Sequence, residues 1–251
     1  MGTLDVSSES PATTSPEGAT TADAPMTSRM VRAIAVTGLA SFVVIISAAL
    51  VAPPLWRAPG TSASAFQVAA YARDDRGSAL ASLLMYSIAI GLFLCFAAGL
   101  ATWFRQSEPA PRPISTAFAF GAVALVGLIL AGFVPYAVLT YRAPDPAVAR
   151  ALRDMTFGLL ALSGIPTAVC LGAYAALVLG GGGLPRWTGW LAVLGAVTHI
   201  LIAASFLAHG GVLSLEGSVI IWAPAVFFSW ILATSLALLW SKPTVGRLAE
   251  S

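Results

Sequence analysis

Charged side chains are scarce in this sequence of 251 residues: Asp, Glu, Lys and Arg make up 10% of it, against about 25% in an ordinary soluble domain. Hydrophobic residues make up 58%, and the mean hydropathy is +0.86. A single aqueous core cannot bury so many apolar side chains, which excludes a soluble domain and predicts an integral membrane protein in contact with a lipid bilayer. A net charge of +2 is too small to indicate a nucleic-acid partner.

Cysteine and histidine are also scarce, with two of each. Cys95 and Cys170 lie in apolar runs without a CxxC spacing, which argues against a disulfide framework. His199 and His209 are ten positions apart on one predicted helix, or about 15 Å along it and 280° around it, so they cannot both bind one haem iron. We therefore expect no cofactor and no metal site.

Six long stretches contain no Asp, Glu, Lys or Arg, and each exceeds the roughly 20 residues that a helix needs to cross a hydrocarbon core of about 30 Å. Their apolar residues are continuous, whereas the strands of a membrane barrel alternate apolar and polar residues. The sequence therefore predicts an all-α, polytopic bundle of six transmembrane helices. The predicted helices cover about residues 33–53, 79–103, 115–140, 155–179, 188–208 and 219–240.

Three segments follow from this pattern. Residues 1–28 are rich in Ser, Thr, Pro and Ala, lack aromatic side chains, and are predicted to be a disordered tail. A signal peptide is the alternative, but the polar region of about 30 residues is long for one, and Pro53 and Pro54 disfavour cleavage after the first apolar run. Residues 29–241 form the predicted transmembrane domain, and residues 242–251 form a short C-terminal tail.

The flanking cations give a weak signal for orientation, because seven lie on one side of the predicted bundle and six on the other. Arg29 and Arg32 precede the first helix, which favours an inside N-terminus. Both termini are then cytoplasmic, and we expect a multi-pass protein of a bacterial plasma membrane. Indole and guanidinium groups prefer the membrane interface, so one set of residues is predicted to anchor the cytoplasmic side. These interfacial anchors are Trp103, Arg186, Trp187, Trp190 and Trp240.

Two predicted outer loops contain helical patterns of their own. In SAFQVAAYARDD, Phe66, Ala69 and Arg73 share helical spacing. In APDPAVARALRDM, Asp145 is a suitable N-cap and Pro146 a suitable first residue for a helix that continues into the fourth span. We expect both segments to be interfacial helices on the outer surface.

Small residues recur at every fourth position of the fourth predicted span, where they would allow a neighbouring backbone to approach closely. They are Ala168, Gly172, Ala176 and Gly180. A contact with another helix of the same chain is favoured over a homodimer face, because six spans must first pack on one another.

Proline residues fall inside three predicted spans. Pro135, Pro166 and Pro224 each remove one backbone hydrogen bond and are expected to kink the third, fourth and sixth spans. Bent helices are common in transporters, although kinks also occur in membrane proteins that have no moving parts.

The turn before the fifth predicted span reads GGGGLPRWTGW, in which the glycines permit a tight reversal. The segments LPRWTGWLAVLGAVTHILIAASF, AYARDDRGSALASLLMYSIAIGLFLCF and APAVFFSWILATSLALLW resemble a group of uncharacterised six-helix membrane proteins from actinobacteria, classified as a domain of unknown function. The resemblance covers about residues 30–241. It implies the six-helix topology and supplies no catalytic residues.

One polar residue lies near the middle of each of five predicted spans. They are Ser41, Ser87, Ser163, His199 and Ser229. If these side chains face inward, they form a polar layer suited to a neutral or amphipathic ligand. The favoured alternative is that the serines bond to their own helices and that His199 makes a structural hydrogen bond.

Three functional hypotheses remain open at this stage. The first is a non-enzymatic structural, regulatory or assembly role, with self-association through the fourth span. The second is a small permease, or a protein that handles lipids or apolar ligands through the polar layer. The absence of charged residues in the spans argues against ion-coupled transport but leaves movement of an apolar substrate open.

The third hypothesis is an intramembrane serine hydrolase that uses Ser163 and His199. Trp56-Arg57 and the sequence Ala161-Leu-Ser-Gly164 partly resemble motifs of rhomboid proteases, which also have six spans. However, Ala161 replaces the first glycine of the motif, and the histidines fall on the fifth span or at its end instead of on the sixth. We therefore expect a protein that is not an enzyme.

Overall fold

The protein is described here by a computed structural model that covers residues 26–51, 58–60, 62–106, 112–142, 145–208, 212 and 218–241. The predicted C-terminal tail 242–251, and the predicted N-terminal tail up to residue 25, lie outside the described residues.

The all-α prediction is confirmed: six helices are long and apolar enough to cross a membrane, and the described part of the chain contains no strand. Within the described residues, each predicted span coincides with helix, apart from the break at Ser163 and the end of the fifth span at Leu207. Flanking Arg residues join the first turn of α8 and the first and last turns of α4 and α5. The spans are α1 (Ser28–Val51), α4 (Arg76–Gln106), α5 (Arg112–Arg142), α6 (Pro146–Leu162) with α7 (Gly164–Leu179), α8 (Arg186–Ala204) with the 3₁₀ turn η2 (Ser205–Leu207), and α9 (Ser218–Trp240).

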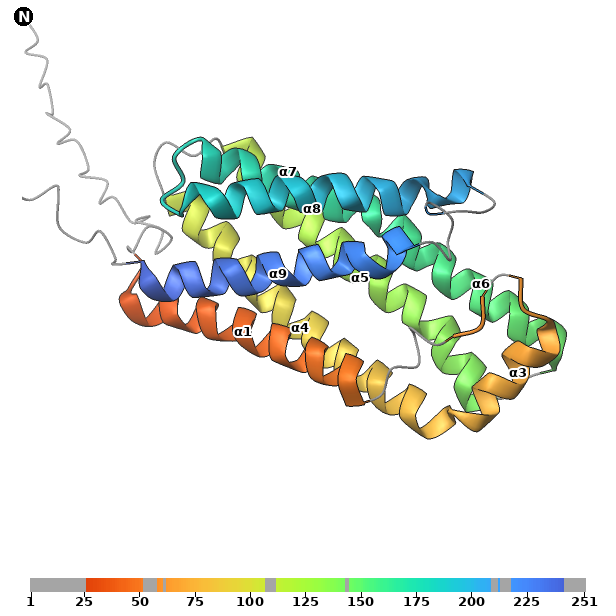
Figure 1. Cartoon of the computed structure of the whole chain (residues 1–251). Helices are drawn as coiled ribbons and strands as arrows, with labels where there is room; N and C mark the ends of the chain where they lie inside the picture. The colour runs from red at the N-terminus through yellow and green to blue at the C-terminus, as the bar shows by residue number, and fades with distance from the viewer. Residues whose placement is uncertain are drawn as a thin grey trace, which may run out of the picture.

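The six spans form a closed ring (Figure 1). The neighbouring pairs around it are α1–α4, α4–α5, α5–α6 together with α5–α7, α7–α8, α8–α9 and α9–α1. One interhelical hydrogen bond fixes α1 on α4: the Ser41 hydroxyl donates to the Ala89 carbonyl over 2.8 Å. Ring closure leaves an interior that side chains of all six spans can reach.

Both helical patterns predicted outside the spans are confirmed as helices. Helix α3 (Ala65–Asp74) begins with a capping box, in which the Gln67 amide N–H donates to the Ser64 hydroxyl and the Ser64 N–H donates to the Gln67 side chain. Asp145 caps α6 by accepting from the N–H groups of Ala147 and Val148 at 3.0 and 3.3 Å. Helix α3 packs against the first part of α6 at one end of the molecule, which we call the α3 end (Figure 1).

The fourth span is broken, and α6 stops at Leu162 while α7 starts at Gly164. Pro166 has no N–H to donate to the Leu162 carbonyl, which weakens the helix at this turn. The prediction of a bend near Pro166 is therefore met by a change of helix at Ser163. Pro135 and Pro224 lie within the continuous helices α5 and α9.

The prediction that the small residues of α7 pack against another helix of this chain is wrong. Ala168 is half-buried, and Gly172, Ala176 and Gly180 are exposed. A Cβ added at Gly172 would meet nothing within 4 Å. Spacing alone does not say which face of a helix turns inward, and α7 instead buries the face that carries Cys170, Leu171, Tyr174 and Val178.

Aromatic side chains fill the interior of the ring towards the end opposite α3. The Tyr174 ring lies edge-on to Trp230 at 4.9 Å and to Phe104 at 5.6 Å between centroids. The Tyr174 hydroxyl is hydrogen-bonded to Thr188 at 2.9 Å and to Thr234 at 3.1 Å, which ties α7 to α8 and α9. This end of the bundle is therefore solidly packed.

The predicted interfacial anchors gather at this same end, which we call the tryptophan end (Figure 1). Arg186, Trp187, Trp190 and Trp240 are exposed, and the indole N–H of Trp103 donates to the Gly182 carbonyl of the α7–α8 turn over 3.3 Å. Gly181 and Gly183 have positive φ angles of 106° and 77°, which explains the glycine run in this turn.

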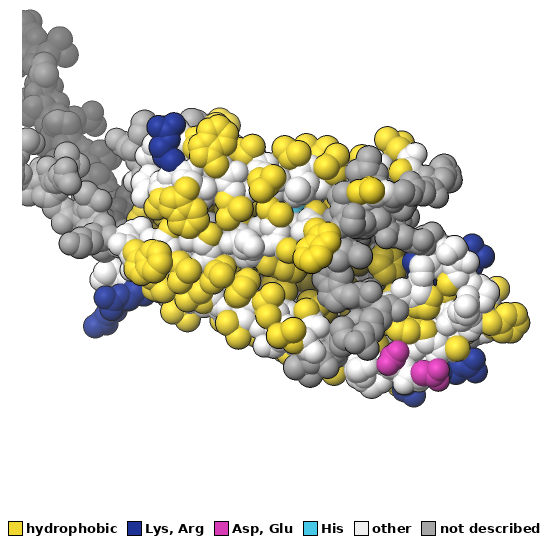
Figure 2. All heavy atoms as spheres, in the orientation of Figure 1, with side chains coloured by type: hydrophobic (Ala, Val, Ile, Leu, Met, Phe, Trp, Pro, Cys, Tyr) yellow, Lys and Arg dark blue, Asp and Glu magenta, His cyan; other side chains and the backbone are white. Residues whose placement is uncertain are grey.

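The spans differ in length, and the longer ones extend further at the α3 end. Helices α4 and α5 have 31 residues each and so extend about 46 Å, whereas α1 and α9 have 24 and 23 residues and extend about 35 Å. Hydrophobic side chains cover the middle of the face shown in Figure 2, and the coloured charged side chains lie towards its two ends. The α3 end thus projects beyond the shorter spans.

Candidate functional site

A partly open cavity of about 400 Å³ is lined by side chains of the ring on the α3 side of the aromatic packing. All six spans contribute to its wall, and the short segment at residues 58–60 contributes as well. Most of the wall is aliphatic or aromatic. The lining also includes a cation, two further polar side chains and two phenylalanine rings: Arg153, Ser163, His199, Phe157 and Phe227, with Ala161 between them on α6.

Helix α6 supplies one continuous wall of the cavity. Arg153, Phe157, Leu160 and Ala161 line it, and their intervals of four, three and one positions place them on one face of the helix. Ser163 lines it at the helix break, ten positions beyond Arg153. Ten residues of helix rise about 15 Å, which sets the length of this wall.

Gly164 explains why the helix break lies directly against α8. A Cβ at this position would collide with the backbone carbonyl of His199 and would come within 3.1 Å of the Ala203 amide nitrogen. Only glycine allows the two backbones to approach so closely. The contact fixes the broken segment of the fourth span beside the part of α8 that carries His199.

His199 is buried in the cavity wall with one ring nitrogen already engaged. Its Nδ1 donates to the Gly195 carbonyl over 2.8 Å, because a carbonyl oxygen can only accept and Nδ1 must therefore carry the proton. The ring lies edge-on to Phe227, with 5.7 Å between centroids. This arrangement holds the imidazole in one orientation within an apolar wall.

Ser163 lies on the same cavity wall but does not pair with His199. Its hydroxyl donates to the Leu160 carbonyl over 2.6 Å, and no hydrogen bond joins Ser163 to His199 within the described part of the chain. The Ser–His contact that a hydrolase would need is therefore not formed in this structure. Trp56, Arg57 and His209 lie outside the described residues.

The other three serines of the predicted polar layer do not line the cavity. Ser41 is buried against α4 through its bond to Ala89. Ser87 and Ser229 donate to carbonyls of their own helices, Leu83 and Ala225, both over 2.8 Å, and Ser229 is exposed. The structure thus brings together Ser163 and His199 and separates the rest, because midspan depth does not determine which way a side chain faces.

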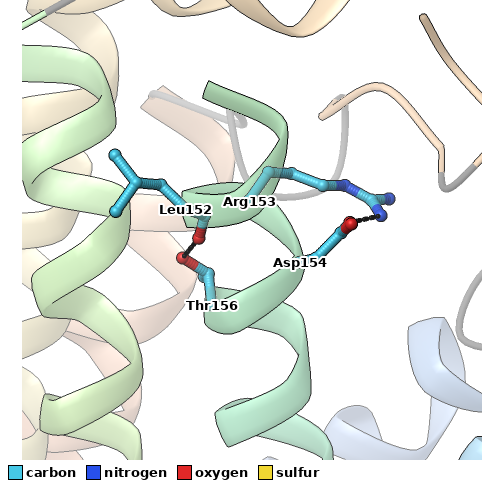
Figure 3. Close-up of polar contacts among 4 residues, drawn as sticks. All are labelled: Leu152, Arg153, Asp154 and Thr156. Atoms are coloured by element: carbon cyan, nitrogen blue, oxygen red, sulfur yellow. Dashed lines mark hydrogen bonds and ion pairs between the residues drawn. The ribbon is translucent and has the colours of Figure 1, made fainter. Parts of the chain in front are cut away.

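Arg153 is the site residue that the sequence analysis missed, since it was counted among the cations that flank the fourth span. Its side chain is only 5% exposed, and it lines the end of the cavity nearest α3. Nη1 is 3.1 Å from Oδ1 of Asp154, a side chain that is 51% exposed (Figure 3). The guanidinium carbon lies 4.6 Å from the centroid of the Phe157 ring.

The Arg153 guanidinium is only partly satisfied. Its Nε is buried and has no hydrogen-bond partner. The i+4 and i+7 spacing of Arg153 to Phe157 and Leu160 was the available signal, because it puts the cation on the same helix face as core residues. Arg153 is the one charged side chain among the described residues that line the cavity.

These features define the class of protein: a polytopic α-helical membrane protein, with a ring of six spans around an apolar cavity that has one cation at its α3 end. No family model, no curated protein and no solved structure matches this chain. The site must therefore be interpreted from its own geometry.

Proposed function

We propose that this protein binds an apolar or amphipathic ligand within the membrane, in the cavity bounded by α6, α8 and their neighbours. The single observation that carries the proposal is the cavity itself. Protein interiors are packed with few voids larger than a water molecule, whereas ligand pockets fall in the range of about 300–1,000 Å³. A volume of about 400 Å³ with an apolar wall belongs to the second group.

The proposal favours ligand handling over catalysis. The mostly apolar wall offers three polar side chains, Arg153, Ser163 and His199, and Ser163 is bonded to its own helix. Such a site can hold or pass on a lipid-like molecule without changing it. We place the protein in a bacterial plasma membrane with both termini cytoplasmic, so that the tryptophan end faces the cytoplasm and the α3 end the outside.

Filling the cavity tests the proposal. Ala161 is 2% exposed and lines the cavity, so Ala161→Phe should occupy part of the ligand volume. Ala176→Phe is the matched control, because it adds the same side chain on the exposed face of α7. We expect mass spectrometry of gently purified protein to find a specific ligand in the wild type and in Ala176→Phe, and much less in Ala161→Phe. Equal ligand content in all three proteins would contradict the proposal.

A structural or assembly role is the second candidate, and the exposed small-residue face of α7 favours it. Small residues on a lipid-facing helix allow a second helix to approach closely. Self-association through this face would be weakened by Ala176→Phe and left intact by Ala161→Phe. Crosslinking in native membranes distinguishes the two, and recovery of monomer alone from the wild type would exclude this role.

A further inference from the structure

Arg153 is a buried cation whose environment does not satisfy it. Removal of a guanidinium from water is costly unless its N–H groups find partners. Asp154 accepts from Nη1 alone, and the Phe157 ring covers part of the guanidinium face. Nε has no partner, and no hydrogen bond to Nη2 is present within the described part of the chain. The side chain therefore retains N–H donors that no acceptor among the described residues engages.

The unused donors lie on one edge of the guanidinium. In arginine the Nε–H points to the same side as Nη2, and together they form the side-on edge that receives two oxygens of a carboxylate or phosphate. Asp154 contacts Nη1, which lies on the other side. The Arg153–Asp154 pair thus leaves the edge best suited to a second anion without a bonded acceptor.

Asp154 also repels such an anion, but its side chain is 51% exposed while that of Arg153 is 5% exposed. Water screens the exposed carboxylate more than the buried cation. An anion within the cavity therefore interacts more strongly with the buried Arg153 cation than with the exposed Asp154 carboxylate.

Arg153 lies at the depth in the bilayer where lipid head groups lie. Leu179, at the tryptophan end, lies 26 positions after Arg153, a distance of at most about 39 Å along α6 and α7. The hydrocarbon core is about 30 Å thick and the bilayer with its head groups about 40–45 Å. Arg153 therefore lies near the polar boundary, and the cavity extends from it into the apolar core.

The wall along α6 suits one extended chain. It runs about 15 Å from Arg153 to Ser163. The cavity volume of about 400 Å³ lies in the range of pockets that hold one small ligand, about 300–1,000 Å³.

We propose that the cavity binds a single-chain amphiphile with an anionic head group, a long-chain carboxylate or alkyl phosphate. The head group binds the Nε–Nη2 edge of Arg153, and the chain lies along α6 towards Ser163 and His199. This inference rests on the proposed ligand-binding function and assigns its ligand class.

The test uses two matched photoreactive probes, a diazirine-bearing dodecanoate and the corresponding dodecanol, with the full-length protein reconstituted in phosphatidylcholine vesicles. We expect the dodecanoate to label peptides of the cavity wall. Arg153→Met should reduce this labelling about tenfold, the effect of losing a charge-assisted hydrogen bond, and leave labelling by dodecanol unchanged. Dodecyl phosphate should compete with the dodecanoate, and inorganic phosphate should not.

Two further variants keep the test decisive. Arg150→Met removes an exposed cation from the same helix and should leave dodecanoate labelling unchanged, so an equal loss there would overturn the inference. Asp154→Asn removes the competing negative charge and should maintain or increase labelling by the dodecanoate; a decrease would also overturn it.

The two proposals fail in different ways. If neither probe labels the cavity wall, the proposed ligand-binding function is wrong. If both probes label it equally and Arg153→Met changes neither, the cavity binds apolar molecules and the assignment of an anionic head group is wrong.

Discussion

At the scale of single residues, the approach of α7 to α8 depends on Gly164. A methyl group there would strike the His199 carbonyl, and neither backbone can yield without moving its helix. Gly164→Ala should therefore destabilise the protein by about 1–3 kcal/mol. Gly172→Ala is the matched control, since nothing lies within 4 Å of the added group and alanine favours the helix by about 0.5–1 kcal/mol. Thermal unfolding in detergent measures both.

Gly164→Ala should also disturb the cavity wall, because Ser163 and His199 are adjacent to the close contact between α7 and α8. If Gly164→Ala unfolds at the wild-type temperature or above it, the backbones of α7 and α8 do not approach each other as closely as this contact requires.

At the scale of elements, the start of α6 depends on the Asp145 cap. Asp145→Ala removes the acceptor for the N–H groups of Ala147 and Val148 and should cost about 1 kcal/mol. Hydrogen–deuterium exchange should become faster in the first turn of α6 and stay unchanged in α7. Val148→Ala, on an exposed side chain of the same turn, serves as the control. Unchanged exchange in Asp145→Ala would show that packing of α3 alone fixes this turn.

Sequence analysis succeeded for elements whose signal is local. Charge-free stretches predicted the spans, because a charged side chain in hydrocarbon is costly wherever it lies along the helix. Asp145 followed by Pro146 predicted the start of α6 because capping involves only neighbouring residues. The inward face of α7 was not predictable in this way: Ala168, Gly172 and Ala176 share a face, but whether that face meets protein or lipid depends on five other helices.

At the scale of the whole molecule, the proposed orientation puts the tryptophan end in the cytoplasm and the α3 end outside the cell. Single cysteines at exposed positions of opposite ends test it, in a background in which Cys95 and Cys170 are replaced. Arg150→Cys should react with a membrane-impermeant thiol reagent in intact cells, and Arg186→Cys only after permeabilisation. The opposite pattern of labelling would show that the α3 end, and not the tryptophan end, faces the cytoplasm.

The cavity is also a property of the whole molecule, which is why the sequence predicted its residues only in part. Ser163 and His199 were selected for their depth and do share the wall, whereas Ser41, Ser87 and Ser229 have similar depth and face elsewhere. Arg153 was interpreted as a flanking cation because the projection of α4, α5 and α6 beyond the shorter spans is visible only after the ring is assembled. Side-chain direction and relative helix length are set by tertiary packing.

A density map of the purified protein tests the proposal that the cavity holds a ligand. The protein should be purified in a mild detergent without removal of lipid, and the map should resolve side chains on α6 and α8. We predict elongated density between Arg153 and Ser163 that no side chain accounts for, with its broader end at the Arg153 guanidinium. A cavity closed by side chains, or one with no density along α6, would contradict the claim.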